Sequence, residues 1–175
     1  MSSTFWGLIK LCRPKQWIKN LFVLAPLLFA GLFTDFNSII SAFTAMLLFC
    51  IASSATYILN DLKDIEKDRL HPQKSKTRPL ASGAVIPKQA KILMFAFYIF
   101  LAISSFFFPL ILAVIVSYLL LNFLYSHYLK HQPVLDIFTI AIGFVLRVYA
   151  GAVAINVPVS SWMFITTLCL ALYLA

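Results

Sequence analysis

Charged residues are scarce in this sequence. Only 11% of its 175 residues are Asp, Glu, Lys or Arg, whereas 62% are hydrophobic, and the mean hydropathy is +0.93. Average soluble domains are roughly a quarter charged, so these values exclude an ordinary water-soluble protein. Cysteines are also few, and Cys12, Cys50 and Cys169 lack the spacing of a zinc site or a disulfide framework. We expect a protein that lies mainly in a bilayer.

Acidic residues are the scarcer of the two charged types. The chain has 6 of them against 14 lysines and arginines, which gives a net charge of +8. Such an excess is compatible with nucleic-acid binding, but here the basic residues are interleaved with long apolar runs. That arrangement is typical of the cytoplasmic edge of a membrane protein. We therefore expect membrane lipids as partners, and no nucleic acid.

Apolar stretches predict six membrane helices, in residues 21–34, 39–59, 92–129 (two spans), 134–154 and 162–175. A span needs about 20 residues, so we expect Trp17 and Ile18 to extend the first stretch. The long stretch is expected to break at Phe106-Phe107-Phe108-Pro109, because proline cannot continue a helix. The last stretch is short of a full span, so we predict one membrane domain over residues 1–175, truncated at its C-terminus.

All lysines and arginines except Arg147 lie before the first predicted helix or in alternate connections between the helices. They precede the first helix and follow the second and the fourth, whereas the connections around Asp35, Pro109 and Asn156 have none. Loops rich in lysine and arginine stay in the cytoplasm. We expect the N-terminus and the loop at residues 60–91 to be cytoplasmic.

Four of the six acidic residues follow the second predicted helix, in the segment from Asn60 to Arg69. If that helix continues, Asp61, Asp64 and Asp68 line one face, where they repel one another unless a cation lies between them. Mg²⁺ is typically held by one or two carboxylates together with the phosphates of a substrate. We predict a Mg²⁺ site formed by Asn60, Asp61, Asp64 and Asp68. The alternative is a solvated helix end that only marks the membrane boundary.

A basic segment follows the acidic one directly. Lys74, Lys76 and Arg78 are suited to phosphate, because arginine binds it bidentately and lysine supplies a point charge. A metal beside such cations on a membrane surface suggests a phosphorylated substrate, such as a lipid phosphate. The next residues, 79–83, are expected to form a turn.

Other polar residues lie close to the predicted spans. Asn20 is a candidate substrate contact, whereas Lys15 is more simply interpreted as a headgroup anchor. Tyr125 belongs either to a substrate site or to the aromatic belt. Asp136 and Arg147 lie eleven residues apart within one span, which puts them on one face about 16 Å apart. Ionisable groups at that depth face a cavity or form a structural tie, and both interpretations stay open.

The acidic segment resembles the first aspartate-rich motif of the UbiA prenyltransferase superfamily. The opening Arg13-Pro14-Lys15-Gln16-Trp17-Ile18-Lys19-Asn20, with His71-Pro72-Gln73-Lys74 and Arg78-Pro79-Leu80-Ala81-Ser82-Gly83, looks most like its decaprenyl-phosphate phosphoribosyltransferase branch. Later positions are also similar, namely Tyr125, Lys130, Asp136, Gly143, Phe144, Arg147 and Gly151.

The resemblance implies an all-α polytopic bundle of about nine spans, of which about six are present here. It implies a transferase of the bacterial inner membrane that uses Mg²⁺ to move 5-phosphoribose from phosphoribosyl diphosphate to a polyprenyl phosphate, which yields a pentose donor for cell-wall polymers. Asp61, Asp64 and Lys130 would be catalytic. The substrate-binding residues would be Asn20, Lys74, Arg78, Tyr125, Asp136 and Arg147.

Two other functions remain open. An aromatic prenyltransferase of the same superfamily also fits the acidic cluster, although the dense basic segment favours the phosphoribosyl reaction. A transporter or non-catalytic membrane subunit is the alternative from another class. Coupled transporters concentrate polar groups near the midplane, whereas here most charges gather at one interface. The superfamily's second aspartate-rich motif lies beyond these residues, and the sequence leaves the lipid chain length and the oligomeric state open.

Overall fold

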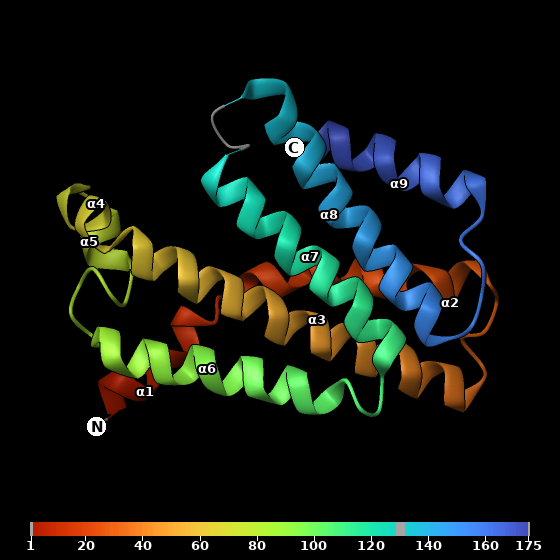
Figure 1. The fold of residues 1–175 in the computed structure, drawn as a ribbon, viewed down its shortest axis with the longest axis horizontal. Helices are drawn as coiled ribbons and strands as arrows, with labels where there is room; N and C mark the ends of the chain where they lie inside the picture. Colours follow the sequence, from red (N-terminus) through yellow and green to blue (C-terminus); the bar gives the residue numbers. More distant parts are fainter. Residues whose placement is uncertain (1, 129–131, 175) are drawn as a thin grey trace. The chain divides into compact units, whose positions relative to one another are not determined.

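The computed structural model describes residues 2–128 and 132–174, and all regular elements in these residues are helices (Figure 1). This result confirms the predicted all-α class. The elements are α1 (Ser2–Leu11), η1 (Pro14–Leu24), α2 (Ala25–Phe29), α3 (Phe36–Lys63), α4 (Ile65–Leu70), α5 (Lys74–Thr77), α6 (Pro87–Ser104), α7 (Pro109–His127), α8 (Pro133–Ala154) and α9 (Ser161–Leu174).

Within residues 2–128 and 132–174, four helices, α3, α6, α7 and α8, are long and apolar enough to cross a membrane, and α9 is a shorter apolar helix. The predicted break in the long apolar stretch is confirmed, since α6 ends at Ser104 and α7 begins at Pro109. Proline suits this position because the N–H group of the first residue in a helix has no intrahelical acceptor. Two spans therefore form where the sequence shows one apolar run.

Asp35 fixes the start of α3. The backbone N–H of Ser38 donates a hydrogen bond of 2.8 Å to Asp35 Oδ2, which caps the first turn of the helix. Hydrogen bonds from Ser38 stabilise the charged form and lower the pKa of Asp35. This acidic residue therefore has a local structural role, away from the acidic segment at the other end of α3.

The first predicted span is not one α-helix, which differs from the expectation. Residues up to Leu24 form the 3₁₀-helix η1, and only Ala25–Phe29 is α-helical. Pro26 lies in the first turn of α2, and it disfavours a continuous α-helix across the end of η1 because its ring clashes with the carbonyl four residues earlier. A 3₁₀-helix rises about 2.0 Å per residue, so η1 and α2 together still cover about 30 Å. Asn20 and Val23, three residues apart, are the buried side chains of η1.

The chain divides into two compact units, each built from two separate segments. The first unit is Met1–Ile18 with Ile51–Ala102, and the second is Lys19–Cys50 with Ile103–Ala175. The sequence predicted one membrane domain over the whole chain, and that domain assignment stays a prediction.

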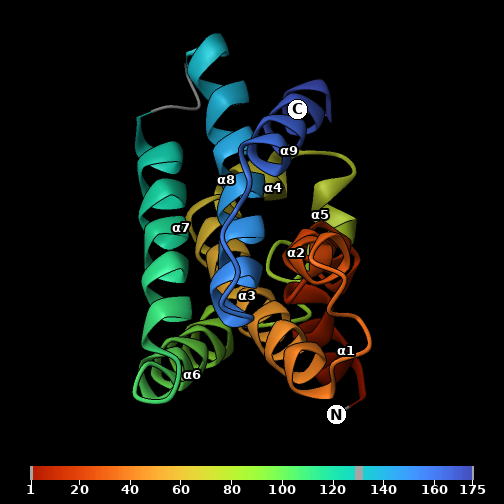
Figure 2. The same cartoon turned by 90° about the vertical axis from the view of Figure 1, so that its right-hand side faces the viewer.

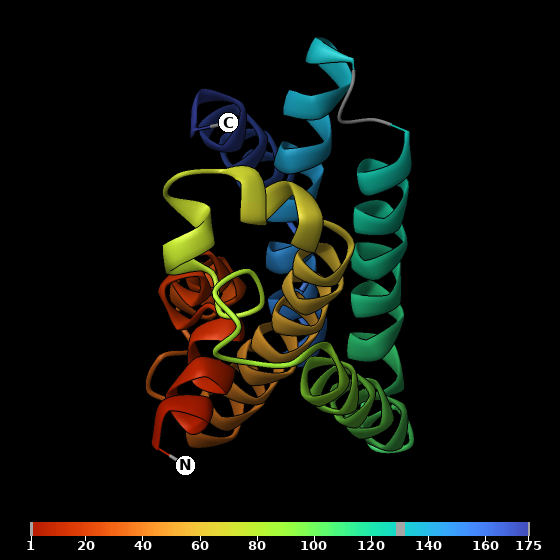
Figure 3. The ribbon, with the colours of Figure 1, turned by 90° about the vertical axis from the view of Figure 1, so that its left-hand side faces the viewer.

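The core of the first unit joins α1, the second half of α3 and α6. Leu11, Ile58 and Met94 from these helices bury against Leu80 and Val85, which belong to the turn that precedes α6. Figure 3 shows α4 and α5 as a short hook beyond the end of α3, followed by this turn. Burying the turn residues holds the basic segment next to α3.

In the second unit, α8 packs against α7, α9 and α2 (Figure 2). The approach of η1 to α8 is very close at Gly151. A Cβ atom there would lie 1.8 Å from the carbonyl oxygen of Val23. The rings of Phe22 and Phe144 pack edge to face nearby, with centroids 4.9 Å apart. The absence of a side chain at Gly151 is therefore a condition for this packing.

We predict that Gly151→Ala destabilises the protein by about 3 kcal/mol, because the added methyl group would push a backbone carbonyl and its helix away. Gly143→Ala in the same helix is the matched control. Its Cβ would lie 3.5 Å from the nearest atom, an ordinary contact, and alanine favours helix formation. Thermal unfolding in detergent measures both variants. Equal midpoints for the two would contradict the close packing at Gly151.

Candidate active site at the end of helix α3

The acidic segment lies at a break between two helices. Helix α3 ends at Lys63, Asp64 has φ −97° and ψ 8°, and α4 begins at Ile65. The condition for one continuous helix face, that the helix runs on through Asp68, is therefore not met. Asp61 and Asp68 are buried, with only 2% and 4% of their surface exposed, whereas Asp64 is partly exposed. The segment therefore has two buried carboxylates, a partly exposed one at Asp64 and an exposed one at Glu66.

The two buried carboxylates share one arginine. Nη1 of Arg78 donates hydrogen bonds to Asp61 Oδ1 at 2.8 Å and to Asp68 Oδ2 at 2.6 Å. Lys74 Nζ lies 3.8 Å from the other oxygen of Asp68. Lys74 and Arg78, both predicted as substrate-binding residues, thus lie beside the two predicted metal ligands. The predicted roles of Lys74 and Arg78 in substrate binding, and of Asp61 and Asp68 in metal binding, stay predictions.

Arg13 is the residue that the sequence-based prediction missed. Its Nη2 donates a hydrogen bond of 2.5 Å to Asp61 Oδ1, the oxygen that Arg78 also binds. Its guanidinium also lies over the ring of Tyr57, 4.9 Å from the centroid. The available signal was its place as the first residue of the segment from Arg13 to Asn20, which contributes to the family resemblance.

The backbone at Arg13 supports this contact. Its φ of 52° lies in the left-handed region, which non-glycine residues seldom adopt and which tends to occur where a site requires it. The following residues are tied to α3, because Trp17 Nε1 donates to Ser54 Oγ at 3.1 Å and Ser54 Oγ donates to the carbonyl of Cys12. The turn between α1 and η1 is therefore held in position against α3.

Asp61 and Asp68 bring carboxylate oxygens, the ligand type that Mg²⁺ takes in proteins, to one place in the structure. A single nitrogen atom of Arg78 lies between Asp61 and Asp68, so both oxygens already face one positive group. Both arginines bind Oδ1 of Asp61, and no described residue binds its Oδ2. Across residues 2–128 and 132–174 no three His, Cys, Asp or Glu side chains group as a metal site. Mg²⁺ bound here would take most of its ligands from water and phosphates.

A second polar cluster surrounds Arg147 in the other unit. Arg147 is 5% exposed and donates from Nε to Asn20 Oδ1 at 2.8 Å, and from Nη1 to the Gly143 carbonyl at 2.7 Å. Its Nη2 donates to the Tyr118 hydroxyl at 3.3 Å. Asn20 is completely buried and donates in turn to Cys50 Sγ. The structure brings together Asn20 and Arg147, which are 127 positions apart in the chain.

Aromatic rings complete the surroundings of Arg147. Its guanidinium carbon lies 4.9 Å from the ring centroid of Tyr118 and 5.4 Å from those of Phe49 and Phe144. No carboxylate pairs with it among the described residues. Because each of its three nitrogen atoms donates to a neutral partner inside the protein, the geometry favours the structural alternative for Arg147. The predicted contact of Asn20 and Arg147 with substrate stays a prediction.

Tyr125 and Asp136 lie together near the end of α7 and the start of α8. The Tyr125 hydroxyl interacts with the Asp136 carboxyl group, and the Asp136 Oδ1 atom is buried without a hydrogen-bond partner in the part of the chain that is described. Asp136 and Arg147, on one helix, therefore have different neighbours. Lys130, the third predicted catalytic residue, lies outside the described residues.

Residues 21–175 match the sequence profile of the UbiA prenyltransferase family, and the chain belongs to this family. Its four long apolar helices agree with a multi-pass membrane protein. The family relationship also supports an enzyme of the transferase class.

Several curated proteins are similar to this chain. The decaprenyl-phosphate phosphoribosyltransferase of Mycolicibacterium smegmatis is 38% identical over 174 residues, which are 97% of this chain and 54% of that protein. The protein of the same name from Corynebacterium glutamicum is 39% identical, over 97% of this chain and 52% of its own length. That of Mycobacterium tuberculosis is 36% identical, over 89% and 53%. The chain spans about half the length of these relatives.

We predict that Asn20→Leu destabilises the protein, because it leaves the buried Arg147 Nε without its acceptor. A hydrogen bond to a charged group contributes about 1.5–3 kcal/mol. Asn20→Asp keeps the acceptor oxygen and adds an opposite charge, so it should retain most of the stability. Chemical unfolding in detergent compares the two variants. Equal losses would show that the Asn20 acceptor does not stabilise Arg147.

Proposed function

We propose that the full-length protein transfers 5-phosphoribose from phosphoribosyl diphosphate to a polyprenyl phosphate, as a Mg²⁺-dependent enzyme of the bacterial cell membrane. The product would be a lipid-bound pentose donor for cell-wall polymers. The relatives named decaprenyl-phosphate phosphoribosyltransferase support this choice over an aromatic prenyltransferase. The N-terminus and the 60–91 loop would lie on the cytoplasmic side, where a water-soluble sugar diphosphate is available.

The observation that carries the proposal is the group of three cations on two buried carboxylates. Arg13, Lys74 and Arg78 contact Asp61 and Asp68 at the end of a membrane helix. A purely structural ion pair would need one partner for each carboxylate. The surplus of positive groups suits a substrate that brings its own negative charge, as a diphosphate does.

The proposed reaction is a substitution at the anomeric carbon of the ribose. An oxygen of the lipid phosphate forms the new bond to that carbon, the bond to the diphosphate breaks, and the diphosphate leaves with the electron pair. Since the attacking phosphate is already anionic, no strong general base is needed. Arg78 and Lys74 would bind the departing diphosphate, and Lys130 would assist as the predicted catalytic cation. These contacts stabilise the charge that develops on the leaving group.

Asn60, Asp61, Asp64 and Asp68 are the residues that would hold Mg²⁺. The metal, when bound, would neutralise charge on the diphosphate. Asp61 would keep its position through Arg13 and Arg78, which leave its second oxygen available. Asp64 is partly exposed and would reach the same cation from the helix break.

We expect Asp61→Asn and Asp64→Asn each to lower the transfer of labelled phosphoribose to polyprenyl phosphate by at least about 100-fold, because each removes a charge that holds the metal near the diphosphate. Glu66→Gln in the same segment is the matched control. Its side chain is 84% exposed and, among the residues that the structure describes, pairs with Arg69 alone, so activity should stay within about twofold.

Wild-type activity in both aspartate variants would contradict the metal role. A well-folded wild-type protein that makes no labelled lipid, but attaches a prenyl group to an aromatic ring, would instead establish the alternative reaction. Both assays use membranes that contain the full-length protein.

Removal of divalent cations should abolish the transfer, and added Mg²⁺ should restore it. Mn²⁺ binding followed by electron paramagnetic resonance gives a readout that does not depend on turnover. We expect Asp61→Asn to weaken Mn²⁺ binding by about tenfold, the effect of losing about 1.4 kcal/mol of binding energy. The Glu66→Gln protein should bind like wild type. Activity that persists in chelator would overturn the metal dependence.

A further inference from the structure

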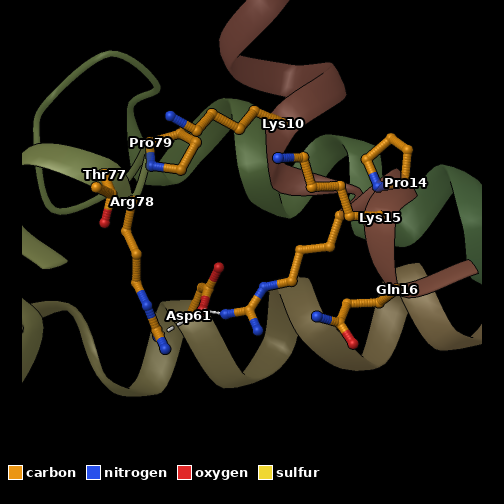
Figure 4. Close-up of a pocket in the computed structure, with 9 residues that line it drawn as sticks. Lys10, Pro14, Lys15, Gln16, Asp61, Thr77, Arg78 and Pro79 are labelled. Carbon is orange, nitrogen blue, oxygen red and sulfur yellow. Dashed lines mark hydrogen bonds and ion pairs between the residues drawn. The ribbon is translucent and has the colours of Figure 1, made fainter.

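A cavity of about 630 Å³ lies in the first unit beside Asp61 (Figure 4). Its walls come from the end of α1, the start of η1, the end of α3, and the last residue of α5 with the two residues that follow it. Asp61 points into it from α3, while Lys10 and Lys15 approach from the opposite side. The cavity thus joins a predicted metal ligand to Lys15, which the sequence analysis interpreted as a headgroup anchor.

The charged side chains around this cavity are strongly unbalanced. Lys10, Arg13, Lys15 and Arg78 line it, and Asp61 is the one acidic residue among the lining side chains. Asp61 pairs with both arginines, whereas no ion pair involves Lys10 or Lys15 within the described residues. An unbalanced group of cations in a concave site attracts an anion. The surplus of positive charge lies on the side where the two lysines enter.

The two arginines of this cavity are held in place before any ligand binds. Arg13 is fixed by Asp61 and by the ring of Tyr57, and Arg78 is fixed by Asp61 and Asp68. A guanidinium has five N–H donors, and Arg13 uses one of them in these contacts. Donors that are already oriented cost little conformational entropy when an anion binds. Such a set of donors matches the oxygens of a phosphoryl group.

We propose that this cavity binds a phosphoryl group of a substrate, with Lys10 and Lys15 as binding residues beside Arg13. The identity of the substrate rests on the function proposed above, and two sources share this chemistry: the water-soluble phosphoribosyl diphosphate and the polyprenyl phosphate. Lys10 and Lys15 therefore have a role in binding, in place of the anchoring role inferred from the sequence for Lys15.

Direct binding tests the site without turnover. Inorganic diphosphate is titrated by calorimetry into the detergent-solubilised full-length protein, with EDTA present so that only side chains contribute. The Lys10→Gln/Lys15→Gln double variant should bind diphosphate about tenfold more weakly than wild type, since two charge-assisted contacts are lost. Lys88→Gln/Lys91→Gln is the matched control, because both lysines are exposed in the same unit and do not line the cavity.

Lys10 and Lys15 are exposed, so their substitution should leave the unfolding midpoint unchanged. Lys10→Arg/Lys15→Arg, which keeps both charges, should restore diphosphate binding. A structural role for the lysines would not produce this pattern of loss and rescue at constant stability. The diphosphate titration tests the phosphoryl site without the transfer assay. A protein that lacks this site can therefore be distinguished from a protein that lacks the proposed transferase activity.

Steady-state kinetics identify the source of the phosphoryl group. A rise in KM for phosphoribosyl diphosphate in the Lys10→Gln/Lys15→Gln protein assigns the cavity to the soluble substrate, and a rise for polyprenyl phosphate assigns it to the lipid. In either case kcat should change less than KM, because these residues bind and do not react. Unchanged diphosphate affinity, or unchanged KM for both substrates, would overturn the proposal.

Discussion

The arrangement of the acidic and basic segments in the first unit depends on the hydrogen bonds that the guanidinium group of Arg78 donates. It joins the end of α3, through Asp61, to α4, through Asp68, while its own backbone follows α5. The hydrogen bonds of Arg78 thereby hold α3, α4 and the end of α5 next to one another. Two buried carboxylates would repel each other without this cation, so the same contact that orders the segment also makes the acidic pair possible.

The buried charge of the second unit, Arg147, is stabilised without a carboxylate partner among the described residues. Arg147 is surrounded by an amide, a carbonyl, a hydroxyl and aromatic rings, and the described residues supply no opposite charge. Neutral dipoles and ring faces can spread a positive charge over several partners, which reduces the cost of placing it among apolar helices. The two buried carboxylates with arginine partners, Asp61 and Asp68, lie instead at the end of α3 and in α4 of the first unit.

Elements set by composition and proline position were predictable, and contacts between distant segments were not. The all-α class and the break before Pro109 follow from apolar length and backbone chemistry. The helix break at Asp64 was missed because nothing in its local sequence excludes a helix. The partnership of Asn20 with Arg147, and that of Arg13 with Asp61, depends on tertiary packing, which one sequence without covarying relatives does not reveal.

The 3₁₀ geometry of η1 determines which sequence changes residues 14–24 tolerate. With three residues per turn, Asn20 and Val23 lie in one row, and each further residue advances the helix by about 120° and about 2 Å. Substitutions of similar size at the other positions of η1 should have little effect on packing. An insertion or deletion of one residue before Asn20 would instead turn Asn20 and Val23 away from their buried positions. In evolution, this segment is therefore expected to vary in composition while keeping its length.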